Sequence, residues 1–244
     1  MTHRFLVARE AIQNGQVRFS DDQAHQLRHV LRLRAGDAVR VFDGEHGVDY
    51  VVELSGAAEA RIVGTASQAA EPRTRLVAYP ALLQRVKFEL VLQKLTELGV
   101  AEIVPVLTAH GLVREPPEET RLARWRAILR EATEQCGRGV VPNLHPPLPL
   151  RDAIARACAD GLAIMAYEHE QRSTLRDALR GTISTVSVFV GPEGGYAHDE
   201  VKEAKAAGVR LITLGPRILR TETASPVLAA LVLYELGDLS CGPT

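Results

Sequence analysis

The chain has 244 residues, of which 46% are hydrophobic and 24% are charged, and a formal net charge of −1 at pH 7. Such a length suits one large domain or two small ones, and the composition is that of an ordinary globular protein. No run is long and apolar enough to span a bilayer, the first residues do not resemble a signal peptide, and the three cysteines show no C-x-x-C spacing. We therefore expect a cytoplasmic protein with reduced cysteines and no membrane segment.

The N-terminal part of the chain predicts a small β-domain. Short alternating runs of apolar and polar residues, separated by turn signals, are typical of a barrel or sandwich, and they cover 39–42, 48–53 and 61–63. One helix is expected over 22–32. The pattern changes around Ala70-Glu71-Pro72, so we expect the domain limits 1–72 and 73–244.

The end of that expected helix is rich in arginine. It contains Arg28, Arg32 and Arg34, and Asp37 is the single acid between residues 25 and 40. Proteins that bind RNA gain much of their affinity from phosphate contacts, so the near-neutral total charge argues against RNA while this basic patch argues for it. Guanidinium groups suit phosphate and base contacts, although a GC-rich genome would produce the same arginine excess. We expect these three arginines to contact RNA.

From residue 75 onward, strand-like runs alternate with helical patterns, which predicts a parallel sheet flanked by helices. Strands are expected within 76–83, 102–108, 162–167, 186–190 and 209–213, and helices within 87–99, 118–136 and 199–208. A last helix is expected to begin at the Ser225-Pro226 pair, with Ser225 as the N-cap. This helix is apolar on more than one face as far as Leu236, so it must be buried in the domain or against a second subunit.

Two loops that contain glycine and proline follow the last two predicted strands. They are GPEGG (191–195) and LGPRILRTETA (214–224). Because the carboxyl ends of parallel strands share one sheet edge, we expect both loops to lie where open α/β proteins bind ligands. The glycines leave backbone groups uncovered for a close approach. The pattern lacks the Lys-Ser/Thr of a P-loop and the G-x-G-x-x-G spacing of a dinucleotide site, so it indicates another nucleotide or a cofactor.

These loops, together with QKLTELGV (93–100), EATEQCGR (131–138), HVLRLRAGD (29–37) and VFDG (41–44), resemble the ribosomal small subunit methyltransferase E family. Its members are 16S rRNA uridine N3-methyltransferases of the knotted SPOUT class. The resemblance implies an α/β fold in which a small PUA-like β-barrel precedes a parallel SPOUT domain with a trefoil knot, which general rules for folds do not predict. It also implies S-adenosylmethionine as methyl donor, an obligate homodimer, and 16S rRNA within the small ribosomal subunit as substrate.

The resemblance also assigns roles to particular residues. Arg138 is expected to face the RNA, although a charged helix end in solvent explains it equally well. No metal is expected, since His169 has no partner at metal-binding spacing. The residues expected to bind the methyl donor come from both loops and from the end of an earlier strand: Tyr167, Glu168, Val190, Gly191, Pro192, Glu193, Gly194, Leu214, Gly215, Pro216, Ile218, Leu219 and Thr223.

Methylation of uracil N3 requires that the nitrogen lose a proton whose pKa is about 10, near that of tyrosine. A guanidinium beside the carbonyl oxygens would stabilise the resulting anion, and a carboxylate could accept the proton. We expect Arg220 to be the stabiliser and Glu222 to be the base or a ligand for the amino group of the donor. The alternative for this pair is a solvated ion pair at a helix start.

Two other functions compete with methylation. One is a non-catalytic RNA-binding or ribosome assembly protein with the same fold, and intact motif loops argue against it. The other is an α/β enzyme that acts on a small nucleotide with the N-terminal domain as a lid, and the basic helix argues against that. The sequence departs from the family at Thr108-Ala109-His110, where Ser-Glu-Arg is usual, and at Ala197, which replaces a helix-capping hydroxyl.

Overall fold

The computed structural model describes residues 3–56, 58–66 and 71–239. They form two compact units, one of Met1–Glu71 with Arg130–Val141 and one of Pro72–Leu129 with Pro142–Thr244. The segment Arg130–Val141 thus belongs to the N-terminal unit although it lies far along the chain. No pattern in the sequence indicates this grouping. The domain limits 1–72 and 73–244 stay a prediction.

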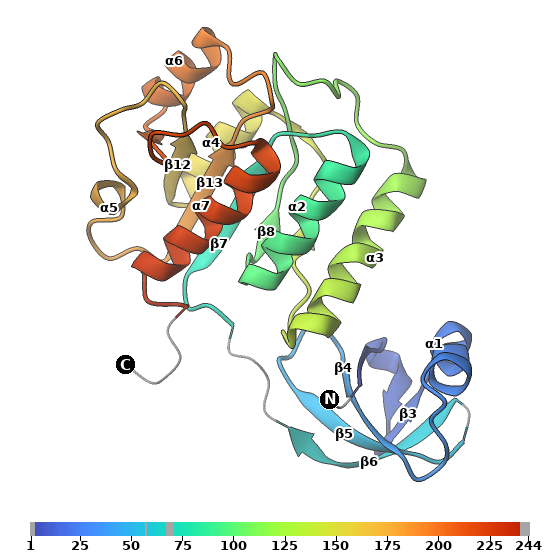
Figure 1. Cartoon of the computed structure of the whole chain (residues 1–244). Coiled ribbons are helices and arrows are strands. Elements are labelled where there is room, and N and C mark those ends of the chain that lie inside the picture. The colour runs from blue at the N-terminus through green and yellow to red at the C-terminus, as the bar shows by residue number, and fades with distance from the viewer. Residues whose placement is uncertain (1–2, 57, 67–70, 240–244) are drawn as a thin grey trace. The chain divides into compact units, whose positions relative to one another are not determined.

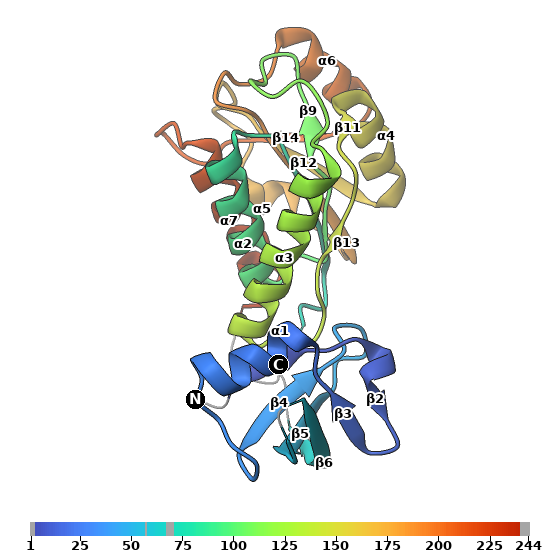
Figure 2. The same cartoon turned by 90° about the vertical axis from the view of Figure 1, so that its right-hand side faces the viewer.

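The N-terminal unit is built on a mixed six-stranded sheet that forms a half-barrel (Figure 2). The strand order is β1-β4-β5-β6-β3-β2, with β1 (Arg4–Leu6), β2 (Ile12–Gln13), β3 (Gln16–Arg18), β4 (Ala38–Phe42), β5 (Asp49–Leu54) and β6 (Glu59–Ala66). Strands β1 and β4 are parallel, and the other neighbours are antiparallel. Alternate side chains point inward, so Val39, Val41 and Val52 are buried. The predicted small β-domain is confirmed.

The helix expected over 22–32 is present in two parts, α1 (Asp21–His25) and a π-helical turn, η2 (Gln26–Val30); a short 3-10 turn, η1 (Arg9–Ala11), lies earlier in the chain. Ser20 caps α1, since its hydroxyl accepts a hydrogen bond from the Gln23 N–H at 3.3 Å while the Gln23 side chain accepts one from the Ser20 N–H at 3.2 Å. At the other end, the Leu33 N–H donates to the Leu27 carbonyl at 2.9 Å. Arg32 lies between them with a φ of 58°, so the helix ends in a left-handed residue.

A buried ion pair ties the segment Arg130–Val141 into the N-terminal unit. The Arg4 guanidinium donates to both oxygens of Asp49, each at 2.7 Å, and to the Thr133 carbonyl at 3.1 Å. It also lies 3.6 Å from the ring centre of Phe42. The Arg4 and Asp49 side chains are only 8% and 1% exposed, so each buried charge is stabilised mainly by the other and little by water.

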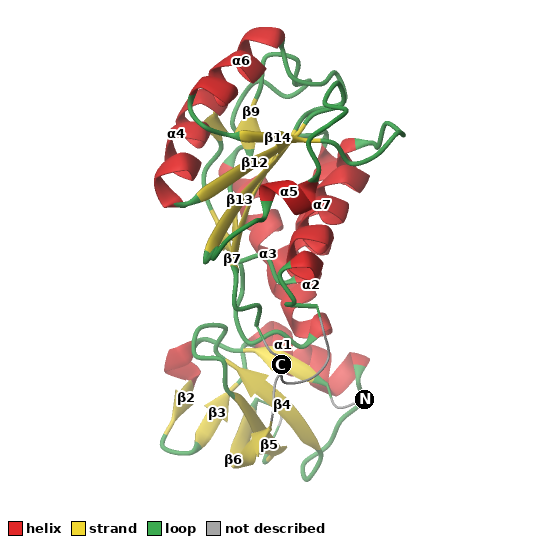
Figure 3. Ribbon diagram, turned by 90° about the vertical axis from the view of Figure 1, so that its left-hand side faces the viewer, coloured by secondary structure: helices red, strands yellow, loops and turns green. Residues whose placement is uncertain are grey.

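The second unit is a parallel sheet with helices on both faces. Its strand order is β10-β8-β7-β13-β12-β14, with β7 (Arg75–Pro80), β8 (Glu102–Ile103), β10 (Asn143–Leu144), β12 (Leu162–Ala166), β13 (Thr185–Val190) and β14 (Arg210–Ile212). A small pair, β9 (Val106–Leu107) and β11 (Leu148–Pro149), is also parallel. Figure 3 shows α4 (Leu150–Asp160) and α6 (His198–Ala206) on one face, with α2 (Arg85–Leu98) and α7 (Thr221–Glu235) on the other. The remaining helices are α3 (Glu119–Cys136) and α5 (Leu175–Ala178).

This arrangement confirms the predicted parallel α/β domain, and the trefoil knot stays a prediction. Because helices cover both faces, the central strands are almost continuous runs of buried residues, as in Val186–Val190 of β13. Helix α7 packs against α2, β7 and β13 (Figure 1). Across the described part of the chain, no helix is both long and apolar enough to cross a membrane.

The start of α7 differs from the expectation. The N-cap is Arg220, whose φ of −66° and ψ of 152° are extended, and Ser225 and Pro226 lie inside the helix. Ser225 is 3% exposed, and its hydroxyl donates to the Thr221 carbonyl at 2.9 Å instead of capping a helix end. Pro226 has no N–H for the preceding turn, so it is tolerated close to the helix start but does not mark it.

Candidate functional site

A cavity of about 480 Å³ opens at the carboxyl edge of the parallel sheet. Its walls are the segments that follow β12, β13 and β14, which is where open α/β sheets bind ligands. Every residue predicted to bind the donor lines this cavity except Thr223, which is exposed on α7. The remaining lining residues are Ala166, His169, Gly195, Thr213, Arg217, Arg220, Thr221 and Ala224.

The glycines of GPEGG are required by packing as well as by access to the backbone. A Cβ at Gly191 would come 2.9 Å from the ring of Tyr196, and one at Gly195, where φ is +68°, would overlap the carboxylate of Glu168. A Cβ at Gly194 would lie 3.1 Å from the Cβ of His110, which is closer than ordinary contact. Gly191 therefore leaves room for the Tyr196 ring, and the positive φ of Gly195 favours glycine at that position.

Two side-chain contacts hold the cavity walls to each other. The Thr221 hydroxyl donates to the Gly191 carbonyl at 2.8 Å, which joins the first turn of α7 to the end of β13. Lys87 of α2 donates to Glu193 at 2.7 Å. Partial burial raises the pKa of the Glu193 carboxyl, but the hydrogen bond and charge of Lys87 outweigh it and hold the pKa below its ordinary value. Glu193 is therefore ionised at neutral pH and braces the loop.

Arg220 and Glu222 lie on either side of Thr221 at the start of α7 and face different surroundings. Arg220 is exposed and lines the cavity. Glu222 does not line it; its Oε2 is buried and has no hydrogen-bond partner among the described residues. The hydrogen bond to Glu193 raises the pKa of Lys87. Arg220 and Glu222 lie near enough for their charges to act on this pKa as well. An unpaired buried carboxylate oxygen costs free energy, and the described residues offer this one no donor.

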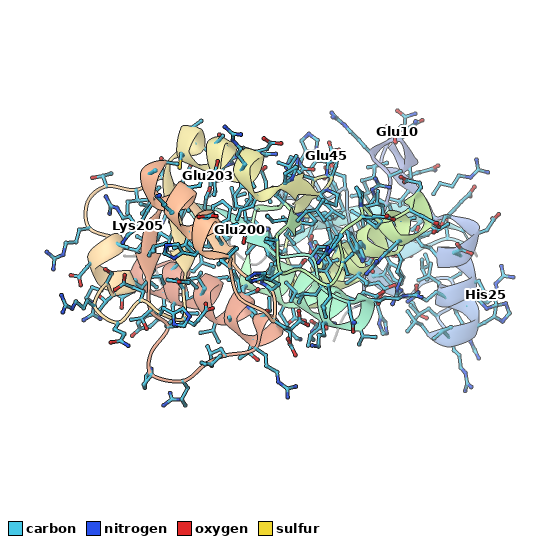
Figure 4. The ribbon with its side chains drawn as sticks, turned by 90° about the horizontal axis from the view of Figure 1, so that it is seen from above. Glu10, His25, Glu45, Glu200, Glu203 and Lys205 are labelled. Atoms are coloured by element: carbon cyan, nitrogen blue, oxygen red, sulfur yellow. The ribbon has the colours of Figure 1, made fainter. Side chains whose placement is uncertain are left out.

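The loop that departs from the family pattern also touches GPEGG. The His110 ring nitrogen Nδ1 donates to the Gly194 carbonyl at 3.2 Å. Glu200, labelled in Figure 4, accepts the N–H groups of Ala109 and Ala197, both at 2.8 Å. One carboxylate thus connects this loop to the start of α6 and forms one half of a capping box, while the hydroxyl that would form the other half is missing at Ala197.

The residues predicted to contact RNA have two different environments. Arg28, Arg32 and Arg34 are exposed on the N-terminal unit. Arg138 is 5% exposed and donates to Glu71 at 3.0 and 2.8 Å, so its guanidinium is paired inside the unit and is not an exposed group like the other three; its expected contact with RNA stays a prediction. Across residues 3–56, 58–66 and 71–239, no group of three His, Cys, Asp or Glu side chains is arranged to hold a metal ion.

Comparison with known proteins identifies the family. A model described as "RNA methyltransferase domain" matches residues 70–233, and one described as "RNA methyltransferase PUA domain" matches residues 19–63. The chain is also 32% identical to Ribosomal RNA small subunit methyltransferase E of Synechocystis sp., over 94% of this chain and 77% of the relative. The chain belongs to this methyltransferase family. Ribosomal RNA small subunit methyltransferase E of Rickettsia conorii is 28% identical and is matched over 91% of each chain.

Solved structures agree with this membership. Ribosomal RNA small subunit methyltransferase E from Neisseria gonorrhoeae, bound to S-adenosyl methionine, has a TM-score of 0.86 at 30% identity and covers 97% of this chain and 98% of its own. A putative methyltransferase from Legionella pneumophila in complex with the bound cofactor SAM has the same TM-score at 26% identity and covers 96% and 98%. The resemblance inferred from the motifs is confirmed, and the protein is an enzyme of the methyltransferase class.

Sequence reasoning missed several residues that shape the methyltransferase site. Lys87 belongs to an amphipathic helix and is separated by 106 positions from its partner Glu193. His110 was noted as a departure from the family pattern, without a role. Thr221 lies inside the recognised motif but was given no function, although Arg220 and Glu222 on either side of it were. Nothing in the sequence marks the first two, since their partners depend on how the loops fold.

Proposed function

We propose that this protein transfers a methyl group from S-adenosylmethionine to N3 of a uridine in 16S rRNA of the small ribosomal subunit, in the cytoplasm. The observation that carries the proposal is the 480 Å³ cavity built by GPEGG and LGPRILRTETA at the carboxyl edge of the sheet. Its volume suits a small organic ligand. The solved relative from Neisseria gonorrhoeae, bound to S-adenosyl methionine, supports the same donor for this chain.

The cavity walls have the chemistry that this donor requires. The backbone of Val190–Gly194 and Leu214–Leu219 offers peptide groups and small apolar surfaces to a flat base and ribose. Glu168 lines the cavity with a carboxylate that suits a ligand ammonium group. When bound, S-adenosylmethionine would supply an electrophilic methyl group on sulfur. Lys87 and Thr221 act on it only indirectly, since they hold the walls in place.

The residues at the start of α7 would prepare the acceptor. N3 of uracil must lose its proton, and Arg220 at the cavity wall would stabilise the negative charge that develops on the carbonyl oxygens. Glu222 would accept the proton or hold the donor's amino group, and its buried Oε2 without a partner among the described residues supports such a role. The nitrogen–methyl bond would form at N3 as the sulfur–methyl bond of the donor breaks, and the N3 proton would pass to Glu222 or to solvent.

The assembly we propose is a homodimer that meets RNA through the N-terminal unit. Helices α2 and α7 pack together and expose the apolar side chains of Val86 (79%), Leu90 (42%), Leu231 (40%) and Tyr234 (68%). Large apolar side chains exposed on two packed helices are typical of an interface. On the N-terminal unit, exposed Arg28, Arg32 and Arg34 would contact the substrate. Arg138 is left out because it is buried against Glu71.

Mass mapping of the methylated nucleosides in rRNA tests the proposed function. A strain that lacks this gene should lose N3-methyluridine from 16S rRNA, and the gene restored on a plasmid should return it. Loss from 23S rRNA instead, or an unchanged N3-methyluridine content in both, would contradict the proposal.

A further inference from the structure

The N-terminal unit has a cavity of its own, of about 230 Å³. Its floor is apolar, since Leu27 and Leu54 are 2% and 3% exposed. Its rim carries Arg28 and Arg34, which are exposed. The remaining lining residues are Leu33, Ala35 and Gly56. A small apolar hollow between two guanidinium groups suits one flat ring system better than a chain of phosphates.

The arginines around this cavity are free to meet a ligand. Within the described residues, the side chains of Arg28, Arg32 and Arg34 make no hydrogen bond and no ion pair. Asp37, the acid that follows them, accepts the backbone N–H of Arg34 at 2.7 Å and not a guanidinium. Three neighbouring cations without a carboxylate partner favour an anionic or electron-rich ligand.

The backbone beside the cavity has an uncommon conformation at Arg32. Arg32 has a φ of 58° at the position after the helix, where the Leu33 to Leu27 hydrogen bond closes the turn. Glycine is preferred there because any Cβ is unfavourable in the left-handed region. The π-helical turn η2 comes directly before it, and such turns are frequent at functional sites. An arginine in this place indicates that its side chain is needed.

We propose that this cavity binds a single unpaired nucleobase of the RNA substrate. Arg28 and Arg34 pack their guanidinium planes on the base, the leucine floor excludes water beneath it, and Arg32 binds a flanking phosphate. His25 and His29 lie on the same helical segment, with ring centres 4.6 Å apart and ring planes tilted by 34°. The inference rests on the proposed RNA substrate and adds which part of the RNA is held, and how.

The test compares three RNA probes on the full-length protein: a mixed-sequence single strand, its abasic counterpart with the same phosphates, and a blunt duplex of equal length. Wild type should bind the base-bearing strand about 10-fold more tightly than the abasic strand. The double change Arg28→Lys with Arg34→Lys keeps both charges but loses the planar groups, so it should abolish this preference and leave abasic affinity unchanged. The matched control is Arg9→Lys with Arg18→Lys, exposed arginines that do not line the cavity.

Three results would overturn the inference. Equal binding of the base-bearing and abasic strands would make the patch a phosphate surface, and equal binding of the blunt duplex would make it a duplex surface. If none of the RNA probes bound but the double variant no longer methylated assembled particles, the cavity with its arginines would be a protein-binding surface instead. Failure of the proposed function is recognised separately, because wild type would then form no N3-methyluridine in small-subunit particles supplied with S-adenosylmethionine.

Discussion

In the cavity of the second unit the walls are mostly backbone and small residues of GPEGG and LGPRILRTETA, whereas the cavity of the N-terminal unit has a leucine floor and an arginine rim. The first needs glycine at fixed positions, because a Cβ would overlap Tyr196 or Glu168. The second needs charged planar groups whose partners are outside the chain. The two proposed ligands would thus be bound in different ways, the methyl donor by the backbone of two loops and the RNA by exposed guanidinium groups.

The largest effect is expected in the scaffold of the N-terminal unit. Asp49→Ala leaves the Arg4 guanidinium buried without its carboxylate, so the free energy of unfolding should fall by about 3–5 kcal/mol. Urea titration measures this, with the exposed Asp22→Ala as the matched control. A loss below about 1 kcal/mol would mean that the ion pair does not hold this unit together and that the arginine rim rests on other contacts.

The next largest effect is expected on methyl-donor binding in the cavity of the second unit. Gly194→Val should weaken S-adenosylmethionine binding by about 10- to 100-fold in calorimetry, because a β-branched side chain enters the wall. The added Cβ also crowds the Cβ of His110 at 3.1 Å, so the double variant Gly194→Val with His110→Gly, which removes that Cβ, separates the causes. Affinity should stay low in the double variant if the ligand meets Gly194 directly. Full recovery would show that only the loop packing was disturbed.

The smallest effect is expected for Arg32→Gly, which should raise the stability of the protein and lower its affinity for RNA. Arg32→Gly relieves the left-handed φ of 58°, so the melting temperature should rise by about 2–4 °C, for a gain of about 1 kcal/mol. The same change removes a phosphate contact, so RNA affinity should fall and its salt dependence should become shallower by about one unit of slope. Melting curves and binding titrations at several salt concentrations measure both. A variant that is more stable and binds RNA normally would remove Arg32 from the RNA surface.

Most of the fold and the outline of the donor cavity could be predicted from the sequence. Strand-like runs before GPEGG and LGPRILRTETA indicate the sheet edge. The glycines mark the loops, because the backbone conformation of a tight loop depends on the residues of the loop itself. The start of α7 could not be predicted in the same way. Ser225-Pro226 has the composition of a helix start, but the extended Arg220 begins the helix earlier, and Ser225 bonds back to Thr221.

The contacts that brace the site depend on distant pairs. Lys87 meets Glu193 across 106 positions, and Arg138 is buried because Glu71, 67 positions away, accepts its hydrogen bond. No local pattern encodes such pairs. The N-terminal cavity is similar: the sequence predicts a basic patch, and only the fold shows that Leu27 and Leu54 form an apolar floor between Arg28 and Arg34.

Single-turnover methylation of small-subunit particles against pH, for wild type and Arg220→Ala, tests the central claim most directly. If Arg220 stabilises the uracil anion, the variant should lose about 10²- to 10³-fold in rate with little change in donor or RNA affinity. Raising the pH should restore part of the rate, because uracil then loses its proton unaided. A near-normal rate, or a defect confined to donor affinity, would contradict the account and leave Arg220 as part of the cavity wall.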